Sequence, residues 1–205
     1  MPPASLIRRL RRGRPIVVVS GLPRSGTSMA MKMIEAGGLP VVTDGLRHAD
    51  TSNPNGYYEF ERVKNLDKAG DLSWLAEARG KAVKIISFLI TYLPEAYDYR
   101  VVFMQRDLSE VIASQNRMLD ARGAARGAED ERTRALYTTH LEQVDRFLAN
   151  RACFSTLRVG YADAVASPSA QAARINAFLG GHLDEPKMTA VADTALYRNR
   201  GAATG

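Results

Sequence analysis

A segment near the N-terminus, "VVVSGLPRSGTSM" at residues 17–29, combines the residue types of an anion-binding loop. An apolar, β-branched stretch leads into Gly21 and Gly26, and hydroxyl residues follow. Gly26 lets an anion approach the backbone, and the N-terminus of a following helix adds unpaired N–H groups and a positive dipole. Arg24 adds a forked, permanent cation that suits phosphate oxygens. The residues that we expect to contact an anion are Arg24, Ser25, Gly26, Thr27 and Ser28.

The loop lacks the lysine of ATP- and GTP-binding loops, because Thr27 occupies that position. In those enzymes the lysine reaches the transferred phosphoryl group, the next hydroxyl binds magnesium, and an Asp after another strand supports the metal. Asp107 does follow a later apolar stretch, but Asp107 and Glu110 have the spacing of a helix capping box. No His, Cys or Asp cluster has the spacing of a metal site. We therefore expect a metal-free site for a donor whose transferred group carries less charge than a phosphoryl group.

The segment "GLPRSGTS" resembles the loop of the sulfotransferases that use 3′-phosphoadenosine 5′-phosphosulfate (PAPS), especially bacterial and carbohydrate-type members with Arg before "SGT". In that family the loop binds the 5′-phosphosulfate of the donor. The resemblance implies that the protein moves a sulfuryl group from PAPS to a hydroxyl or amine of a small-molecule, lipid or sugar acceptor. It places the donor contacts on the five loop residues named above, with Arg24 also a catalytic candidate.

Two later segments extend the resemblance over most of the chain. "VVFMQRDLSEVIASQNRM" resembles the family's 3′-phosphate-binding segment, whose strand-ending Arg and helical Ser correspond to Arg106 and Ser114. Arg106 is also expected at the carboxyl end of a strand, where open α/β sheets bind ligands. "LRVGYADAVASPSAQAARINAFLG" resembles the segment whose Tyr lies beside the adenine, which implies this role for Tyr161, with a core position as the alternative. The family's C-terminal basic–glycine motif is poorly matched by "RNRG" at residues 198–201.

Sulfuryl transfer needs a base for the acceptor proton and cations near the leaving phosphate. "NPNGYYE" at residues 53–59 resembles a turn in bacterial relatives whose region supplies an acidic base, so Glu59 is our first candidate. A helix N-terminal position, where a carboxylate offsets the dipole, is the alternative for Glu59. His48 is the second candidate, because imidazole titrates near neutral pH, and Asp44 is the third. The two histidines of the C-terminal half are distant in sequence, and we expect them to be structural or exposed.

Lys84 interrupts the apolar run "AVKIIS" at residues 82–87. A buried, unpaired ammonium group is costly, so Lys84 must reach a partner or solvent. It resembles the strand lysine that some sulfotransferases direct at the sulfuryl group, which implies that Lys84 is catalytic as an electrophilic stabiliser. The alternative is a lysine on an edge strand, where its charge keeps other chains from pairing.

Alternating strand and helix signals predict the architecture that must position these residues. Short apolar runs predict strands at 16–20, 82–86, 101–105 and 155–160. Helical patterns are expected at 27–36, 107–120, 131–149 and 168–179. The alternation predicts an α/β fold, a single-domain P-loop-type three-layer sandwich whose central, mainly parallel sheet is flanked by helices.

Composition sets the broad class. The chain has 205 residues and a formal net charge of +6, which suits one α/β domain and favours anionic partners. We expect a basic, solvated N-terminal arm at 1–14 and the catalytic domain at 15–205, with weak membrane-surface contact of the arm as an alternative. No apolar run is long enough for a membrane span, and Cys153 alone forms no internal disulfide, so a cytoplasmic protein is expected.

Two other functions stay open from the sequence. One is a nucleotide or phosphate kinase with a degenerate loop, and the other is a non-catalytic nucleotide-binding protein; no nucleic-acid partner is expected. The acceptor pocket is expected to involve the irregular loop at 43–59 and a charged connection or lid at 121–134. Aromatic residues that are candidates for this pocket, or alternatively for the core, are Tyr57, Tyr58, Trp74 and Phe88.

Overall fold

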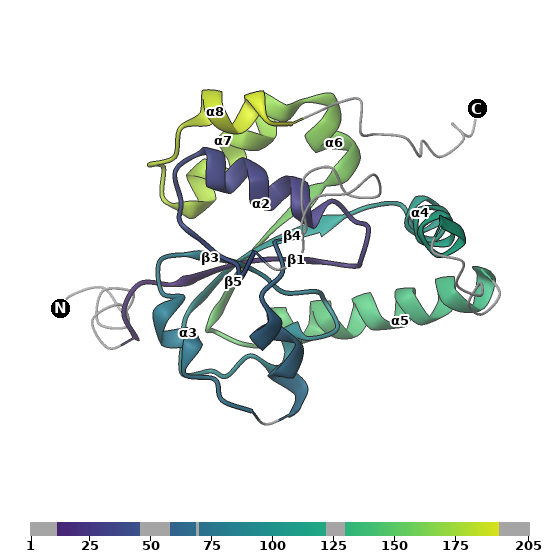
Figure 1. The fold of residues 1–205 in the computed structure, drawn as a ribbon, viewed down its shortest axis with the longest axis horizontal. Helices are drawn as coiled ribbons and strands as arrows, with labels where there is room; N and C mark the ends of the chain where they lie inside the picture. The colour runs from purple at the N-terminus through teal and green to yellow at the C-terminus, as the bar shows by residue number, and fades with distance from the viewer. Residues whose placement is uncertain (1–11, 46–57, 69, 122–129, 193–205) are drawn as a thin grey trace.

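The computed structural model describes residues 12–45, 58–68, 70–121 and 130–192. A five-stranded parallel sheet has the strand order β2-β3-β1-β4-β5. Figure 1 shows this sheet at the centre of the structure, between layers of helices. The strands are β1 (Ile16–Gly21), β2 (Val41–Val42), β3 (Ala82–Lys84), β4 (Tyr99–Gln105) and β5 (Phe154–Gly160). Because the strands are parallel, their carboxyl ends meet at one edge of the sheet, which is where the loop after β1 begins.

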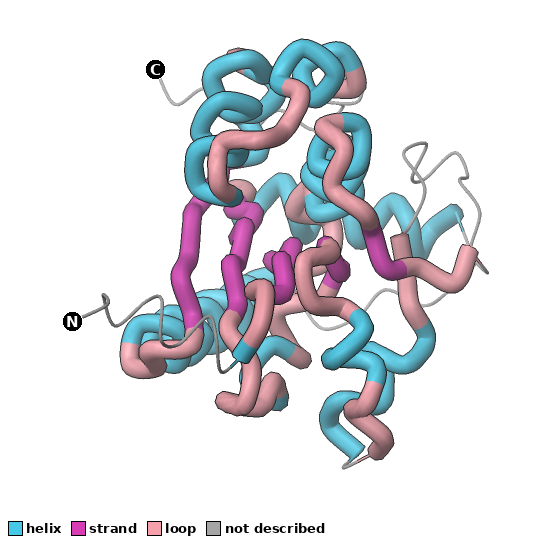
Figure 2. The backbone as a smooth tube through the Cα atoms, turned by 90° about the vertical axis from the view of Figure 1, so that its left-hand side faces the viewer, coloured by secondary structure: helices cyan, strands magenta, loops and turns pink. Residues whose placement is uncertain are grey.

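Helices cover both faces of this sheet, which makes three layers (Figures 1 and 2). The helices on one face are α2 (Thr27–Ala36), α6 (Tyr161–Ala166), α7 (Pro168–Leu179) and α8 (Glu185–Ala190). The other face carries α3 (Trp74–Glu77), α5 (Asp130–Ala149) and the 3₁₀ helices η1 (Glu61–Lys68) and η2 (Ile90–Tyr92). Helix α4 (Leu108–Ala121) follows β4 and packs against the N-terminal part of α5. The predicted fold class is confirmed.

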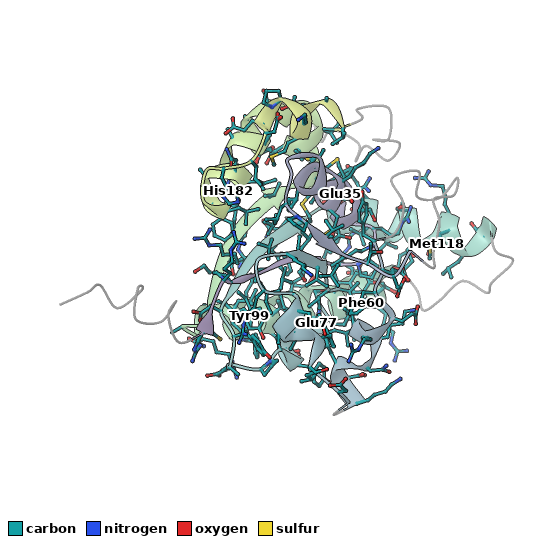
Figure 3. All side chains as sticks on the ribbon, turned by 60° about the vertical axis from the view of Figure 1, so that its left-hand side comes forward. Glu35, Phe60, Glu77, Tyr99, Met118 and His182 are labelled. Atoms are coloured by element: carbon teal, nitrogen blue, oxygen red, sulfur yellow. The ribbon has the colours of Figure 1, made fainter. Side chains whose placement is uncertain are left out.

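The central strand β1 shows why the sequence builds two cores. All six of its residues are buried, and their side chains alternate between the faces because successive residues of a strand point in opposite directions. Val17 and Val19 join the core under α2, whereas Ile16 and Val18 join the core that α5 covers. Tyr99, which is labelled in Figure 3, belongs to the second core. Its ring stacks on Phe154 with 4.9 Å between the ring centroids.

Several predicted boundaries need correction. The strand expected at 82–86 ends at Lys84, and β2 was missed because two residues carry no detectable pattern. The connection or lid expected at 121–134 is helical from Asp130 onward, and its residues 122–129 lie outside the described part of the chain. Cys153 is buried in the core that α5 covers. Trp74 is also in the core and is only 2% exposed, so it does not line an open pocket.

The charged N-terminal segment is described only from Arg12, whose guanidinium lies 3.2 Å from the Asp98 carboxylate. Among the helices that the structure describes, none has the length and apolarity needed to cross a bilayer. Within those same residues, no group of three or more His, Cys, Asp and Glu side chains gathers at a spacing that suits a metal ion.

Candidate anion-binding site at the carboxyl edge of the sheet

The loop after β1 has the backbone of an anion cradle. Arg24 has a φ of 70° and Gly26 a φ of 98°, so two of three successive residues lie in the left-handed region. This alternation turns backbone N–H groups toward one point, immediately before α2 adds its own unpaired N–H groups. A non-glycine residue such as Arg24 at positive φ is strained, and such strain is concentrated at functional sites.

Position 26 requires glycine because of its backbone conformation and because a neighbouring side chain leaves no room for a Cβ atom. A Cβ atom at this position would lie 2.4 Å from Cδ2 of Tyr161, so no side chain fits without moving the ring. Next to it, the Ser25 hydroxyl is buried and has no hydrogen-bond partner among the residues described. Buried hydroxyl groups are nearly always paired in native proteins, so the unpaired Ser25 Oγ fits a site that a ligand completes.

Lys84 reaches this loop from the neighbouring strand. Its Nζ atom lies 3.3 Å from the Ser28 hydroxyl in the first turn of α2. The edge-strand alternative for Lys84 is wrong, because β3 pairs with β1 on one side and with β2 on the other. The ammonium group is therefore held at the N-terminus of α2, where an anion bound by the loop would meet it.

Arg106 and Ser114 approach the same loop from the other side. The Arg24 Nε atom donates a hydrogen bond of 3.1 Å to Ser114 Oγ, and Arg106 Nη1 donates one of 3.1 Å to the Arg24 carbonyl. Ser114 is buried on the α4 face that meets the loop. Two motifs that are far apart in the sequence thus form one continuous polar site.

The guanidinium of Arg106 is held in a fixed position. Its Nε atom lies 2.8 Å from Glu110 Oε2, and both side chains are 7% exposed. The Tyr161 ring lies on one side of the guanidinium, with 4.3 Å between the Arg106 Cζ atom and the ring centroid. A pocket of about 230 Å³ opens beside these groups and is lined by residues that follow β4 and β5, including Arg106, Glu110 and Tyr161.

Glu110 is a site residue that the sequence reasoning assigned only to a helix cap. The cap itself is present, because the Asp107 carboxylate accepts hydrogen bonds from the N–H groups of Ser109 and Glu110 at 2.8 Å and 3.3 Å. Hydrogen bonding to Ser109 is the main cause that lowers the pKa of Asp107. The Glu110 carboxylate instead neutralises Arg106, and the i, i+4 spacing of the two residues was a usable signal for this pair.

The structure describes two of the three residues that were predicted as the catalytic base. The backbone carbonyl of Glu59 accepts hydrogen bonds from Thr43 and Asp44, just after β2, and its carboxylate lies 3.8 Å from Lys64 Nζ. The Asp44 carboxylate accepts a 2.6 Å hydrogen bond from the Glu61 N–H at the start of η1. His48 lies outside the described residues, as do residues 198–201. The assignment of Glu59 as the base stays a prediction.

A solved structure described as the sulfotransferase domain from the curacin biosynthetic pathway matches this chain with a TM-score of 0.50. The match has 16% sequence identity and covers 86% of this chain and 77% of the other. This chain has the sulfotransferase fold. The resemblance noted in the sequence is therefore confirmed at the level of the fold.

Two further solved structures were found in the same comparison. The sulfotransferase domain from the Synechococcus PCC 7002 olefin synthase has a TM-score of 0.48 and 16% identity, over 93% of this chain and 84% of that one. Retinol dehydratase in complex with androsterone and inactive cofactor PAP has a TM-score of 0.46 and 18% identity, over 90% of this chain and 65% of that one. No protein-family description and no curated protein sequence matches the chain.

Proposed function

We propose that the protein transfers a sulfuryl group from PAPS to a hydroxyl or amine of a small-molecule, lipid or sugar acceptor. The observation that carries this proposal is the contact between the loop after β1 and the Arg106–Ser114 segment. Arg24 donates a hydrogen bond to Ser114, and Arg106 donates one to the Arg24 backbone carbonyl. A nucleotide that carries phosphate on both its 3′ and 5′ oxygens needs two anion sites a short distance apart. The loop and the Arg106–Ser114 pair have this arrangement, on a fold shared with a sulfotransferase domain.

Each polar group has a role in this proposal. The five loop residues bind the 5′-phosphosulfate, because they combine N–H groups, hydroxyl groups and the Arg24 cation. Arg106 and Ser114 bind the 3′-phosphate, and Glu110 and Tyr161 hold the Arg106 guanidinium in place. Tyr161 is only 6% exposed, so a contact with the adenine would use the edge of a ring that is otherwise packed.

The transfer step uses the cations at the loop. The acceptor oxygen forms a bond to sulfur while the bond from sulfur to the phosphate oxygen of the donor breaks, and the acceptor proton passes to a base. Negative charge grows on the leaving phosphate, where Arg24 and Lys84 stabilise it by preorganised electrostatic interaction. Lys84 is suited to this role because its bond to Ser28 places the ammonium group at the N-terminus of α2 before the donor arrives.

A thermal-shift comparison tests the donor assignment. Adenosine 3′,5′-bisphosphate at about 100 times its dissociation constant should stabilise the protein by about 2.7 kcal/mol, which is about 5–11 °C in melting temperature. ATP with magnesium should give a smaller shift at equal concentration, because it has no 3′-phosphate for Arg106 and Ser114. A larger shift with magnesium ATP would contradict the proposal and favour the kinase alternative.

Replacing Glu59 by glutamine tests the predicted base. If Glu59 takes the acceptor proton, E59Q should lower kcat by about 100-fold or more, because general bases typically contribute that much. The affinity for adenosine 3′,5′-bisphosphate should stay within about twofold of the wild-type value. Glu61→Gln is a suitable control, because Glu61 also lies near Lys64 but is more exposed than Glu59. Unchanged turnover in E59Q would assign the base to another residue.

A further inference from the structure

The edge of the sheet opposite the loop after β1 carries basic side chains from three neighbouring strands. Arg14 lies two residues before β1, and Arg79 and Lys81 lie just before β3. Arg100 is the second residue of β4. These strands are adjacent in the sheet, in the order β3-β1-β4, and parallel strands begin at a common edge. The four cations therefore gather where these strands begin, and we call this region the amino-edge surface.

Arg14 and Arg79 lie side by side on this surface. A Cβ atom added to Gly80 would lie 3.1 Å from Cδ of Arg14. A Cβ atom added to Gly13 would lie 3.1 Å from Cδ of Arg79. Each arginine side chain thus passes over the glycine that adjoins the other arginine. A 3.0 Å hydrogen bond from the Gly80 N–H group to the Pro15 carbonyl joins the two segments, so both arginines occupy one small area.

Neither of these two arginines has a carboxylate partner. Arg14 and Arg79 are exposed, and neither forms an ion pair with any residue in the described part of the chain. The Asp98 carboxylate at the same edge is already paired with Arg12 at 3.2 Å. Glu77 is close in sequence to Arg79 but forms no ion pair with it. Like charges held together without a counter-charge repel each other, so an anionic partner would stabilise this arrangement.

We propose that the amino-edge surface docks on an anionic membrane, with acidic lipid head groups as its ligands. The sequence that leads into this surface, "LIRRLRRGR" at residues 6–14, mixes leucine and isoleucine with five arginines. Basic residues combined with large apolar ones are typical of segments that bind anionic bilayers, because the head groups attract the cations and the acyl boundary takes up the apolar side chains. The cations at the beginnings of the strands extend this charge onto the folded domain.

Nucleic acid is the other large polyanion, and the amino-edge surface suits it less well. Proteins bind single strands by stacking the bases on aromatic rings. The Tyr97 ring lies beside the arginines, but the Arg79 guanidinium covers it at 4.9 Å from the ring centroid, and the ring also packs against the second core. Duplexes are read by a helix or a two-stranded ribbon in the major groove, whereas this edge consists of the beginnings of largely buried strands.

The amino-edge surface is well separated from the anion-binding site. The six residues of β1 lie between them, which is about 20 Å at the rise of an extended strand (Figure 1). Charges interact over only about 8 Å at physiological ionic strength, so the two sites act independently. A protein docked by this surface would hold the loop after β1 away from the bilayer, open to a donor in solution. The inference therefore does not depend on the proposed function.

Co-sedimentation of the full chain with lipid vesicles tests the inference. The probes are vesicles of phosphatidylcholine alone and vesicles of phosphatidylcholine with an equal amount of phosphatidylserine. R14Q/R79Q should lower the partition coefficient for the anionic vesicles by about 30-fold, because each arginine near the surface contributes about fivefold. R14K/R79K should stay within about threefold of the wild type, because the charge is kept. Binding should be lost in 1 M salt, where the screening length is about 3 Å.

R117Q/R132Q is the matched control. Arg117 on α4 and Arg132 in the first turn of α5 are exposed, and neither forms an ion pair with the residues that the structure describes. Figure 1 shows α4 and the beginning of α5 at the opposite end of the molecule from the start of β1. The control removes the same amount of charge, so it should leave vesicle binding within about threefold of the wild type if the position of the charge matters.

Three results would overturn the inference. The first is a wild-type protein that does not bind the anionic vesicles at low salt. The second is an R14Q/R79Q variant that binds them as the wild type does, or an R117Q/R132Q variant that loses as much, because the amino-edge surface would then not be the docking surface. The third is an R14Q/R79Q variant that loses affinity only for a labelled DNA duplex, because the partner would then be nucleic acid.

A second variant and a second ligand complete the test. If R14Q/R79Q melts at a lower temperature than the wild type, R14Q/K81Q decides the question with the same expected loss, because it keeps Arg79 on the Tyr97 ring. The amino-edge variants should bind adenosine 3′,5′-bisphosphate within about twofold of the wild type in calorimetry, since the two sites are far apart. A protein that binds the vesicles but not the bisphosphate would disprove the proposed function and leave this inference intact.

Discussion

Replacing Arg106 by alanine should weaken the binding of adenosine 3′,5′-bisphosphate by about 100-fold, while the binding of adenosine 5′-phosphate stays within about threefold. A charge-assisted hydrogen bond contributes about 1.5–3 kcal/mol, which corresponds to this loss when the 3′-phosphate loses its cation. Adenosine 5′-phosphate lacks that phosphate and should depend on the loop alone. Isothermal calorimetry with the two nucleotides measures both values. Equal weakening of the two nucleotides would contradict the assigned role of Arg106.

A second variant separates this binding defect from a loss of stability. In R106A the Glu110 carboxylate, now 7% exposed beside Arg106, would be left without its cation. Breaking a buried ion pair by removing one partner typically costs about 3–5 kcal/mol. The double variant R106A/E110Q removes the unpaired charge, so it should recover much of the melting temperature without recovering nucleotide affinity. If affinity returned together with stability, the effect of R106A would be structural.

Replacing Gly26 by alanine should both destabilise the protein and abolish donor binding. The added Cβ would lie 2.4 Å from Tyr161 and would have to adopt a φ of 98°. Overpacking costs about 1–3 kcal/mol, and a left-handed backbone costs a non-glycine residue about 1–2 kcal/mol. Together they predict a loss of about 2–5 kcal/mol, or about 4–20 °C in melting temperature for a chain of this size. Movement of Tyr161 would also displace the Arg106 guanidinium above it.

Gly38→Ala is the matched control for this change. Gly38 has a φ of 96°, close to that of Gly26, but a Cβ atom there meets no heavy atom within 4 Å. G38A should therefore show only the backbone cost of about 1–2 kcal/mol and should bind adenosine 3′,5′-bisphosphate normally. Calorimetry and thermal denaturation of both variants give the comparison. If G26A and G38A lost equal stability and bound adenosine 3′,5′-bisphosphate equally well, the close contact between Gly26 and Tyr161 would not be needed for donor binding.

Much of the fold and part of the site could be predicted from local sequence signals. The buried strand at β1, the loop that follows it and α2 were predicted because apolar periodicity, glycines and hydroxyl residues all occur within one short segment. Strands β4 and β5, which precede Arg106 and Tyr161, were predicted from their short apolar runs. Short elements such as β2 and α8 were missed, because a few residues carry too little periodicity to be recognised.

The amino-acid sequence by itself determined which side chains carry charge, which segments are strands or helices, and which loop suits an anion. Only the tertiary structure decided which distant groups meet: Lys84 with Ser28 from 56 residues away, Arg24 with Ser114 from 90, and His140 with Ser87 from 53. The physical reason is that parallel pairing and helix packing bring the strand ends together, whereas no periodic signal in one chain links residues at such separations. His140 meets Ser87 only because α5 packs against the segment that follows β3.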